Sequence, residues 1–126
     1  MSIIDRRIEK LGILLPEVGE PPASFLHAVT VNNLVYTSGT DCRINGKMLY
    51  TGKLGRELTV EEGKEAAEQT IINLLAVLKN HIGNLDRINK IVKILAFVNS
   101  EPGFNKQPIV IPKYGYPIGS FIAGEV

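Results

Sequence analysis

What this chain of 126 residues lacks excludes several classes of protein. Cys42 is the only cysteine, so no disulfide can form within the chain, which fits a reducing cytoplasm. There is no run of 18 apolar residues, so no transmembrane helix is expected. The charged segment from Met1 to Arg7 also lacks the apolar block of a signal peptide. We therefore expect a cytoplasmic protein without a membrane partner.

Charge and ligand spacing give no sign of nucleic-acid or metal chemistry. The formal net charge is only +1, and no basic stripe with interleaved aromatic residues is visible, so nucleic acid is not the expected partner. His27 and His81 have no metal-ligand spacing, so no metal site is expected. The glycines at 46, 52 and 55 lack the spacing of a phosphate-binding or dinucleotide-binding loop. No cofactor is predicted.

The length predicts one domain over 1–126, with an N-terminal helix and loop at 1–24, a core at 25–104 and a tail of different texture at 105–126. Ser2 is a suitable cap for a short helix from Ile3 to Leu11. The prolines that follow it predict a loop.

A tight hairpin is predicted next, because two β-branched runs flank Asn32-Asn33 and asparagine tolerates the positive φ of a two-residue turn. The second run stops at Ser38-Gly39, where a small hydroxyl meets a bare backbone. That arrangement suits a pocket for a small polar ligand, although an ordinary solvent-facing hairpin end would read the same way. A polar loop with a short strand at Lys47–Tyr50 should follow.

The clearest helix signal is a capping box at Thr59 and Glu62, followed by an apolar stripe that continues to Ile82. A helix from Val60 to Ile82 would be about 35 Å long at ~1.5 Å per residue and needs a sheet to lie on. The nearly all-apolar run Ile88–Val98 predicts a buried central strand. Beyond it, at most a three-residue strand is expected within 107–112, and a last short strand at Phe121–Ala123.

This order of elements resembles the YjgF/RidA (Rid) family over roughly Phe25 to Phe104. No single segment is a strong motif, but their order and spacing together are specific. The matching segments are Tyr36-Thr37-Ser38-Gly39, Gly52-Lys53-Leu54-Gly55, Asn73-Leu74-Leu75, Leu85-Asp86-Arg87-Ile88 and Ala96-Phe97-Val98-Asn99.

The resemblance implies a chorismate-mutase-like α/β fold. In that fold a mixed sheet is backed on one face by helices, and three subunits pack their sheets into a trimeric barrel with ligand clefts between neighbours. The resemblance also implies hydrolysis of reactive enamines and imines such as 2-aminoacrylate, which gives a 2-keto acid and ammonia. The partners expected from it are a small carboxylate-bearing metabolite and two further copies of the chain.

The family's cleft residues carry over to four positions. Ser38 and Gly39 match the Ser-Gly pair, and Asn99 matches the asparagine after the long strand. Phe25 stands where the family often has tyrosine, so an aromatic wall is kept and a phenol hydroxyl is lost. Ser38 would hydrogen-bond the ligand, Gly39 would let it approach the backbone, and Asn99 would orient it.

The tail departs from the family. No arginine follows Arg87, so the carboxylate-binding arginine of the family is not found, and Lys106 or Lys113 would supply only a point charge. The family's second helix and closing strand are also not visible. The tail could be a natural divergence or an altered C-terminus. Two alternatives therefore stand beside a deaminase: a non-catalytic small-carboxylate sensor or scaffold, and an endoribonuclease or translation inhibitor.

A catalytic thiol is the other chemistry to weigh in the core. Cys42 would need a base such as His27 on the same hairpin, and a buried structural cysteine is the preferred interpretation. His81 falls in the last turn of the long helix, where a cation is favourable to the helix dipole.

Overall fold

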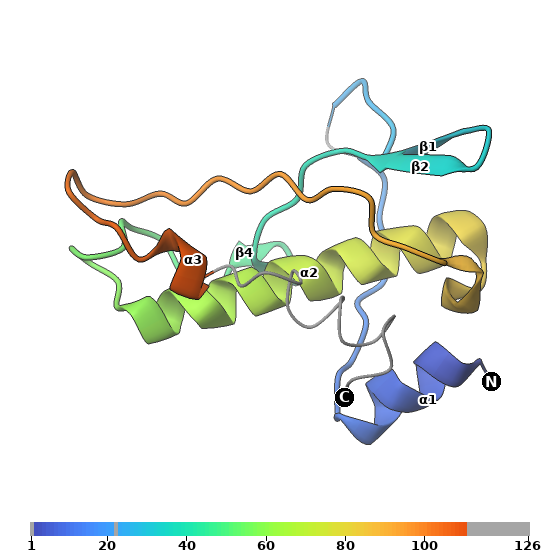
Figure 1. Cartoon of the computed structure of the whole chain (residues 1–126), viewed down its shortest axis with the longest axis horizontal. Helices are drawn as coiled ribbons and strands as arrows, with labels where there is room; N and C mark the ends of the chain where they lie inside the picture. Colours follow the sequence, from blue (N-terminus) through green and yellow to red (C-terminus); the bar gives the residue numbers. More distant parts are fainter. Residues whose placement is uncertain (1, 22, 111–126) are drawn as a thin grey trace.

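The computed structural model describes residues 2–21 and 23–110 (Figure 1). One long helix, α2, runs through the centre of this part of the chain, and the other elements are arranged around it. In chain order the elements are α1 (Ile3–Lys10), β1 (Ala28–Val31), β2 (Leu34–Thr37), β3 (Arg43–Ile44), β4 (Lys47–Met48), α2 (Val60–Ile82), the 3-10 turn η1 (Leu85–Arg87) and α3 (Gln107–Val110).

Helix α2 begins and ends where its capping residues predict. The Glu62 backbone N–H donates to the Thr59 hydroxyl at 3.2 Å, and the Thr59 N–H donates to the Glu62 carboxylate at 3.0 Å, which completes the capping box. Gly83 follows the last residue with a φ of 82°, a conformation that glycine adopts without strain. The predicted helix is confirmed over its full length.

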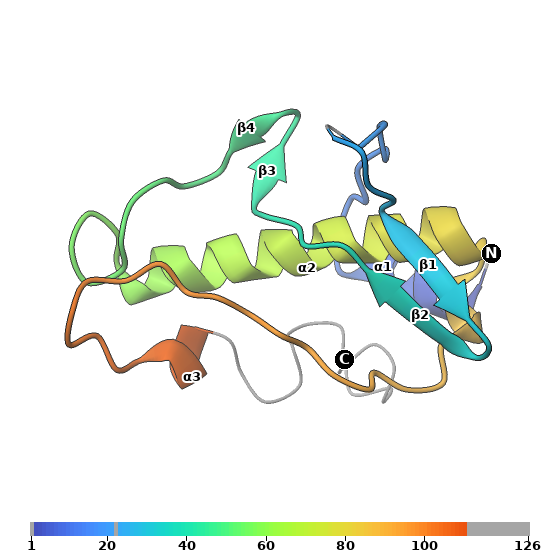
Figure 2. The same cartoon turned by 90° about the horizontal axis from the view of Figure 1, so that it is seen from above.

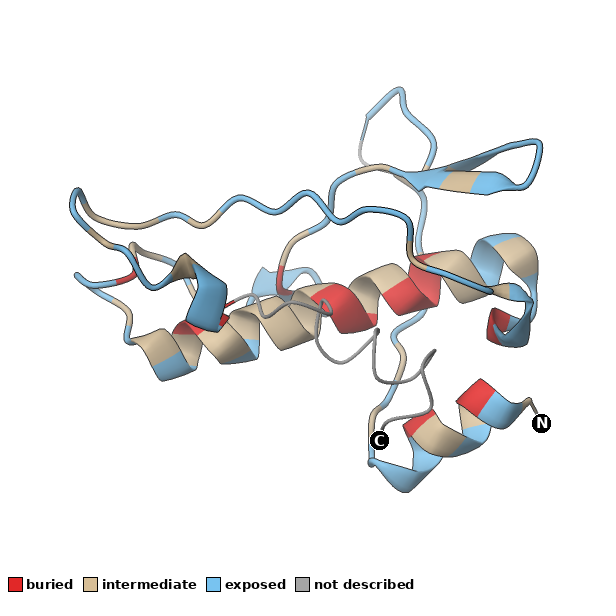
Figure 3. Ribbon diagram, viewed as in Figure 1, coloured by how far each residue is buried: buried red, intermediate tan, exposed pale blue. Residues whose placement is uncertain are grey.

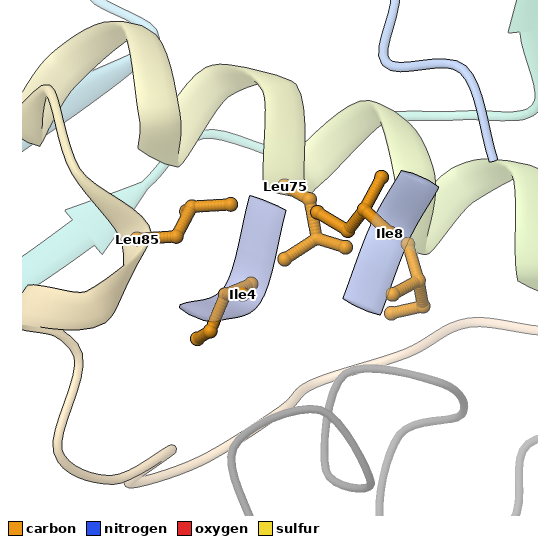
Figure 4. Packing of buried hydrophobic residues seen from close by; sticks show 5 residues of the cluster. Ile4, Ile8, Leu75 and Leu85 are labelled. Atoms are coloured by element: carbon orange, nitrogen blue, oxygen red, sulfur yellow. The ribbon is translucent and has the colours of Figure 1, made fainter. Parts of the chain in front are cut away.

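Helix α1 packs against the C-terminal half of α2 on the side opposite the β1–β2 hairpin (Figures 1 and 3). Its buried side chains, Ile4 and Ile8, join Ile71, Leu75 and Leu85 in the hydrophobic core cluster (Figure 4). Apolar burial of this kind is the main favourable term in folding. The core therefore lies between α1, α2 and η1.

A carboxylate from η1 also holds the start of α1. Asp86 accepts hydrogen bonds from the backbone N–H groups of Ile3 at 2.8 Å and Ile4 at 2.9 Å. These N–H groups have no partner within the helix, and the helix dipole favours negative charge there. Lys79 of α2 adds an ion pair to Asp5 at 2.9 Å. The short N-terminal helix is thus fixed by both apolar and polar contacts.

Two β-hairpins lie beside α2 (Figure 2). β1 pairs antiparallel with β2, with Ala28 opposite Thr37 and Val31 opposite Leu34, and Asn32 in the turn has a φ of 51°. The second hairpin, β3–β4, is shorter, and the sequence predicts only one of its strands, near Lys47–Tyr50. The side-chain N–H₂ group of Asn73 ties it to α2 by donating to the Asp41 and Arg43 carbonyls, each at 2.9 Å.

The predicted central strand at Ile88–Val98 is wrong. No part of this segment is paired as a strand, and it runs back along α2 without a partner until Ser100 bridges to Leu54 (Figures 1 and 2). A central strand needs a neighbour on both edges, and the described elements provide none for it. Ile88 and Ile91 still pack against the core cluster, but the apolar side chains beyond them are largely uncovered, and Phe97 is 89% exposed.

The predicted mixed sheet is likewise not formed within 2–21 and 23–110, which hold two separate two-stranded antiparallel sheets. The segment after the turn at Pro102-Gly103 also differs, because Gln107–Val110 forms one helical turn that packs on α2 instead of a short strand. Helical residues bond locally, whereas a strand there would need an edge to join. The strand predicted at Phe121–Ala123 lies outside the described residues.

We predict that Leu75→Ala lowers the free energy of unfolding by about 2–5 kcal/mol, because Leu75 is only 2% exposed and its truncation leaves a cavity in the cluster. Leu14→Ala is the matched control, since Leu14 is 89% exposed and its truncation should change the value by no more than about 0.5 kcal/mol. Urea denaturation followed by circular dichroism measures both. Equal effects of the two changes would contradict the assignment of this core.

As the pH falls, α1 should detach from the rest of the fold before α2 unfolds. The Ile4 and Ile3 N–H groups lower the pKa of Asp86 below 3.8, and the hydrogen bond from Lys79 lowers the pKa of Asp5 in the same way. A lowered carboxyl pKa stabilises the folded state above the unfolded-state value, and this stabilisation is lost as the pH falls through the folded-state value. Amide exchange should show protection of Ile3 and Ile4 at pH 6 that persists down to pH 3.8 and is lost only at lower pH, once the Asp86 carboxylate is protonated in the folded state.

Asp86→Asn should weaken the same protection at pH 6, because it removes the negative charge at the helix start. Glu9→Gln, at an exposed position of α1, is the control and should leave it unchanged. Equal protection of the Ile3 and Ile4 amides in the wild type and in Asp86→Asn at pH 6 would show that Asp86 does not hold the helix.

Candidate functional site

Three of the four predicted site residues lie at the open end of the β1–β2 hairpin, namely Phe25, Ser38 and Gly39. The Ser38 backbone N–H donates to the His27 carbonyl at 2.9 Å and so extends the strand register by one pair beyond Ala28 and Thr37. Residues directly opposite in an antiparallel pair have their Cβ atoms about 5 Å apart on one face of the hairpin. His27 and Ser38 are therefore neighbours on one face. We call Phe25, His27, Ser38 and Gly39 the hairpin-entry site.

The Ser38 hydroxyl is oriented by the backbone. Its Oγ donates to the Leu26 carbonyl at 2.5 Å, which uses the only proton that the hydroxyl carries. The oxygen lone pairs remain, so Ser38 can still accept a hydrogen bond from a ligand. In the predicted ligand contact, Ser38 would therefore be the acceptor.

His27 is fixed in the same place by two contacts. Its Nε2 lies 2.9 Å from the Gly19 carbonyl, and because a carbonyl only accepts, Nε2 must carry the proton. Its ring meets the Phe25 ring edge to face, with centroids 6.2 Å apart and an angle of 82° between the planes. In the neutral ring Nδ1 is therefore an unprotonated acceptor.

The remaining residues of the site are Gly39, which leaves the backbone accessible, and Phe25, which provides an apolar surface. A Cβ built on Gly39 would meet no atom within 4 Å, so a ligand can reach the backbone at this position. Phe25 is 41% exposed and presents an apolar surface beside His27. The hairpin-entry site therefore combines two oriented polar side chains, an open backbone and an aromatic ring.

Asn99 lies elsewhere in the chain. Its Nδ2 donates to the Gly52 carbonyl at 3.0 Å, and its backbone carbonyl accepts from the Leu54 N–H at 3.0 Å. Leu54 packs against the start of α2 at Gly63, whereas the hairpin is tied near the end of α2 by Thr30 and His81, 2.8 Å apart. One chain therefore does not bring Asn99 to Ser38.

Cys42 and the lysines are not part of the hairpin-entry site. Cys42 is buried, with its sulfur 3.7 Å from the Tyr50 carbonyl, which fits a structural thiol. Tyr50 in turn donates to Glu65, and this hydrogen bond raises the pKa of the Tyr50 phenol. Lys106 precedes α3, and Lys113 lies outside the described residues. Arg87 donates to the Ile82 carbonyl at 2.8 Å and so serves the end of α2.

The described residues hold no metal-binding cluster. No three His, Cys, Asp or Glu side chains in 2–21 and 23–110 are grouped closely enough to hold a metal ion. None of the helices in that part of the chain is both long and apolar enough to span a membrane.

His27 belongs to the hairpin-entry site although the sequence suggested it only as a base for Cys42 or as a metal ligand without a suitable partner. A usable signal was present in the hairpin itself. Counting outward from the Asn32-Asn33 turn, residues that are equally far from it lie opposite each other, as Val31 and Leu34 do. The same count places His27 opposite Ser38.

Comparison with known proteins supports the resemblance seen in the sequence. The profile of the family described as "YjgF/chorismate_mutase-like, putative endoribonuclease" matches residues 5–112. A curated relative, Protein TCP17 from Trypanosoma cruzi, is 33% identical over 103 residues, which are 82% of this chain. The chain spans only 64% of the length of that relative.

Two solved structures share the fold. A protein of unknown function from Agrobacterium tumefaciens is 30% identical, with a TM-score of 0.78 over 98% of this chain and 71% of its own. A protein from Shewanella oneidensis, described as a "putative endoribonuclease", is 29% identical, with a TM-score of 0.82 over 97% of this chain and 80% of its own. The mixed α/β, chorismate-mutase-like fold class is thereby confirmed.

The tautomer of His27 is directly testable. In ¹⁵N-histidine-labelled protein, we expect the neutral ring to carry its proton on Nε2, because Gly19 offers only an acceptor. Nitrogen chemical shifts distinguish the two tautomers, and His27→Gln assigns the signal against that of His81. A proton on Nδ1 would contradict the described geometry of the hairpin-entry site.

Proposed function

Because the chain belongs to the YjgF/chorismate-mutase-like family, we propose that it binds small enamine or imine carboxylic acids at the hairpin-entry site and hydrolyses them. The observation that carries this proposal is the grouping of Phe25, Ser38 and Gly39 at one hairpin end. These are three of the four positions that the family resemblance marks as cleft residues.

The proposed reaction needs little from the protein beyond binding and orientation. Water adds to the imine carbon of the ligand, and the resulting carbinolamine loses ammonia to leave a 2-keto acid. The open backbone at Gly39 gives the ligand close approach, Ser38 accepts a hydrogen bond from it, and Phe25 shields one side from solvent. Holding reactants in such a geometry is a recognised source of rate acceleration.

A non-catalytic role in binding small carboxylates is the second candidate, and one observation favours it. No arginine follows Arg87, so the two charge-assisted hydrogen bonds that a guanidinium gives a carboxylate are not available from the tail. Losing such bonds would weaken affinity by about two to four powers of ten. Ribonuclease activity, suggested by the description of the Shewanella protein, has less support here because the net charge is only +1.

We also propose that three copies assemble to cover the exposed apolar surface. The hairpin and the 88–98 segment carry large apolar side chains that a single chain leaves in solvent (Figure 3). Contiguous exposed apolar surface commonly marks an interface. Asn99, which one chain keeps away from Ser38, would then serve a cleft shared with a neighbouring copy. A molar mass of one chain by light scattering would contradict this assembly.

Activity is tested with freshly generated 2-aminoacrylate, by measuring ammonia and keto acid release with and without the folded protein. We expect release above the spontaneous rate. Gly39→Ala should reduce it at least about tenfold, since a methyl group would fill the space needed by the ligand. The same change should leave the melting temperature unaltered, because Gly39 has no positive φ and no atom within 4 Å of an added Cβ.

The outcomes separate the candidates. Binding of pyruvate without acceleration of hydrolysis would support the sensor or scaffold role and contradict the enzymatic one. Full activity in Gly39→Ala would show that the ligand does not bind against this backbone. Salt-dependent binding of RNA, in the absence of either small-molecule effect, would favour the nucleic-acid alternative.

A further inference from the structure

We propose that His27 determines the substrate class of the hairpin-entry site by selecting ligands that carry an amino or imino nitrogen. In this proposal Nδ1 of His27 and Oγ of Ser38 together accept hydrogen bonds from that nitrogen. The inference rests on the proposed function and adds a residue to which neither the family resemblance nor the comparisons assign a role.

His27 and Ser38 are positioned on the same face of the hairpin. His27 and Ser38 are opposite each other in the extended register of β1 and β2, because the Ser38 N–H donates to the His27 carbonyl at 2.9 Å. Opposite residues place their side chains on the same face, close enough for both to contact one small molecule. The Phe25 ring, with its centroid 6.2 Å from that of the imidazole, lies next to the pair.

Hydrogen bonds to the backbone fix the polarity of both side chains. Ser38 has committed its only proton to the Leu26 carbonyl, and His27 has committed the proton on Nε2 to the Gly19 carbonyl. What remains on each neutral side chain is a lone pair. Two residues that are opposite each other in the hairpin register are therefore each left with an acceptor, and each side chain is held by a hydrogen bond to the backbone.

A ligand that matches these two acceptors must carry hydrogen-bond donors. An NH₂ group has two N–H donors and can satisfy both acceptors, whereas a keto oxygen only accepts and would face two lone pairs. Burying an acceptor without a donor is costly, so the pair should discriminate between ligands of equal shape. Hydrolysis removes the nitrogen, so the same pair would bind the keto acid product less well and favour its release.

Oxamate and pyruvate provide the test, because they share a 2-keto carboxylate and differ by an NH₂ group in place of a methyl group. Calorimetric titration of the wild-type protein at neutral pH should show oxamate binding about five- to tenfold more tightly than pyruvate, the effect of about one net hydrogen bond. His27→Phe keeps a ring beside Phe25 and removes the acceptor, so it should abolish the preference.

Two further variants guard against a merely structural effect. His27→Gln retains an acceptor oxygen and should restore part of the preference. His81→Phe makes the same change at the other histidine, which is hydrogen-bonded to Thr30 outside the hairpin-entry site. It should leave the preference for oxamate over pyruvate unchanged. Thermal melts check that each variant is folded.

Each outcome decides a separate question. Equal binding of oxamate and pyruvate by the wild type, or an unchanged preference in His27→Phe, would overturn the role of His27 and leave the proposed function standing. Failure of the wild type to bind either compound would overturn the proposed function, and the role of His27 with it.

Discussion

The packing of α1 and η1 against the C-terminal half of α2 is the contact on which the rest of the described structure depends. Leu75 and Leu85 are the most deeply buried large side chains, at 2% and 1% exposure, and both belong to this cluster. The opposite side of α2 then carries both hairpins through polar ties from Asn73 and His81. A long helix fixed at both ends by its caps can serve in this way as a rigid support.

The hairpin-entry site inherits its geometry from local interactions. Ser38, Leu26 and His27 are joined by hydrogen bonds across one strand pair, and Gly19 reaches the His27 ring from the preceding loop. None of these contacts requires the tail of the chain. The site can therefore keep its two oriented acceptors even where the C-terminal sequence departs from the family, which is what makes ligand binding separable from hydrolysis.

The sequence predicted those elements whose signals are local. Ser2 caps α1 through the Asp5 N–H, Thr59 and Glu62 cap α2, and Asn32 turns the first hairpin, all as expected. The Ile88–Val98 strand was wrong, and the mixed sheet is not formed within residues 2–21 and 23–110, because strand pairing depends on partners that hydrophobicity alone does not identify. An apolar run indicates that a segment should be buried, but it does not identify the element that buries it.

The same distinction explains the prediction of the site. Phe25, Ser38 and Gly39 lie within one hairpin, so their proximity followed from the turn, whereas the position of Asn99 depends on contacts with Gly52 and Leu54, far away in the sequence. The hairpin register alone could have placed His27 opposite Ser38, whereas the Gly19 carbonyl that fixes its ring lies in a loop and leaves no mark in the sequence.

The central claim is that a small carboxylate ligand binds at the open end of the β1–β2 hairpin. Titration of ¹⁵N-labelled protein with pyruvate, followed by amide chemical shifts, tests it most directly. We expect the largest shifts at Ser38 and Gly39 and in the neighbouring strand residues, with the amides of α1 unaffected. Shifts centred on any other region, or no shifts at millimolar pyruvate, would contradict it.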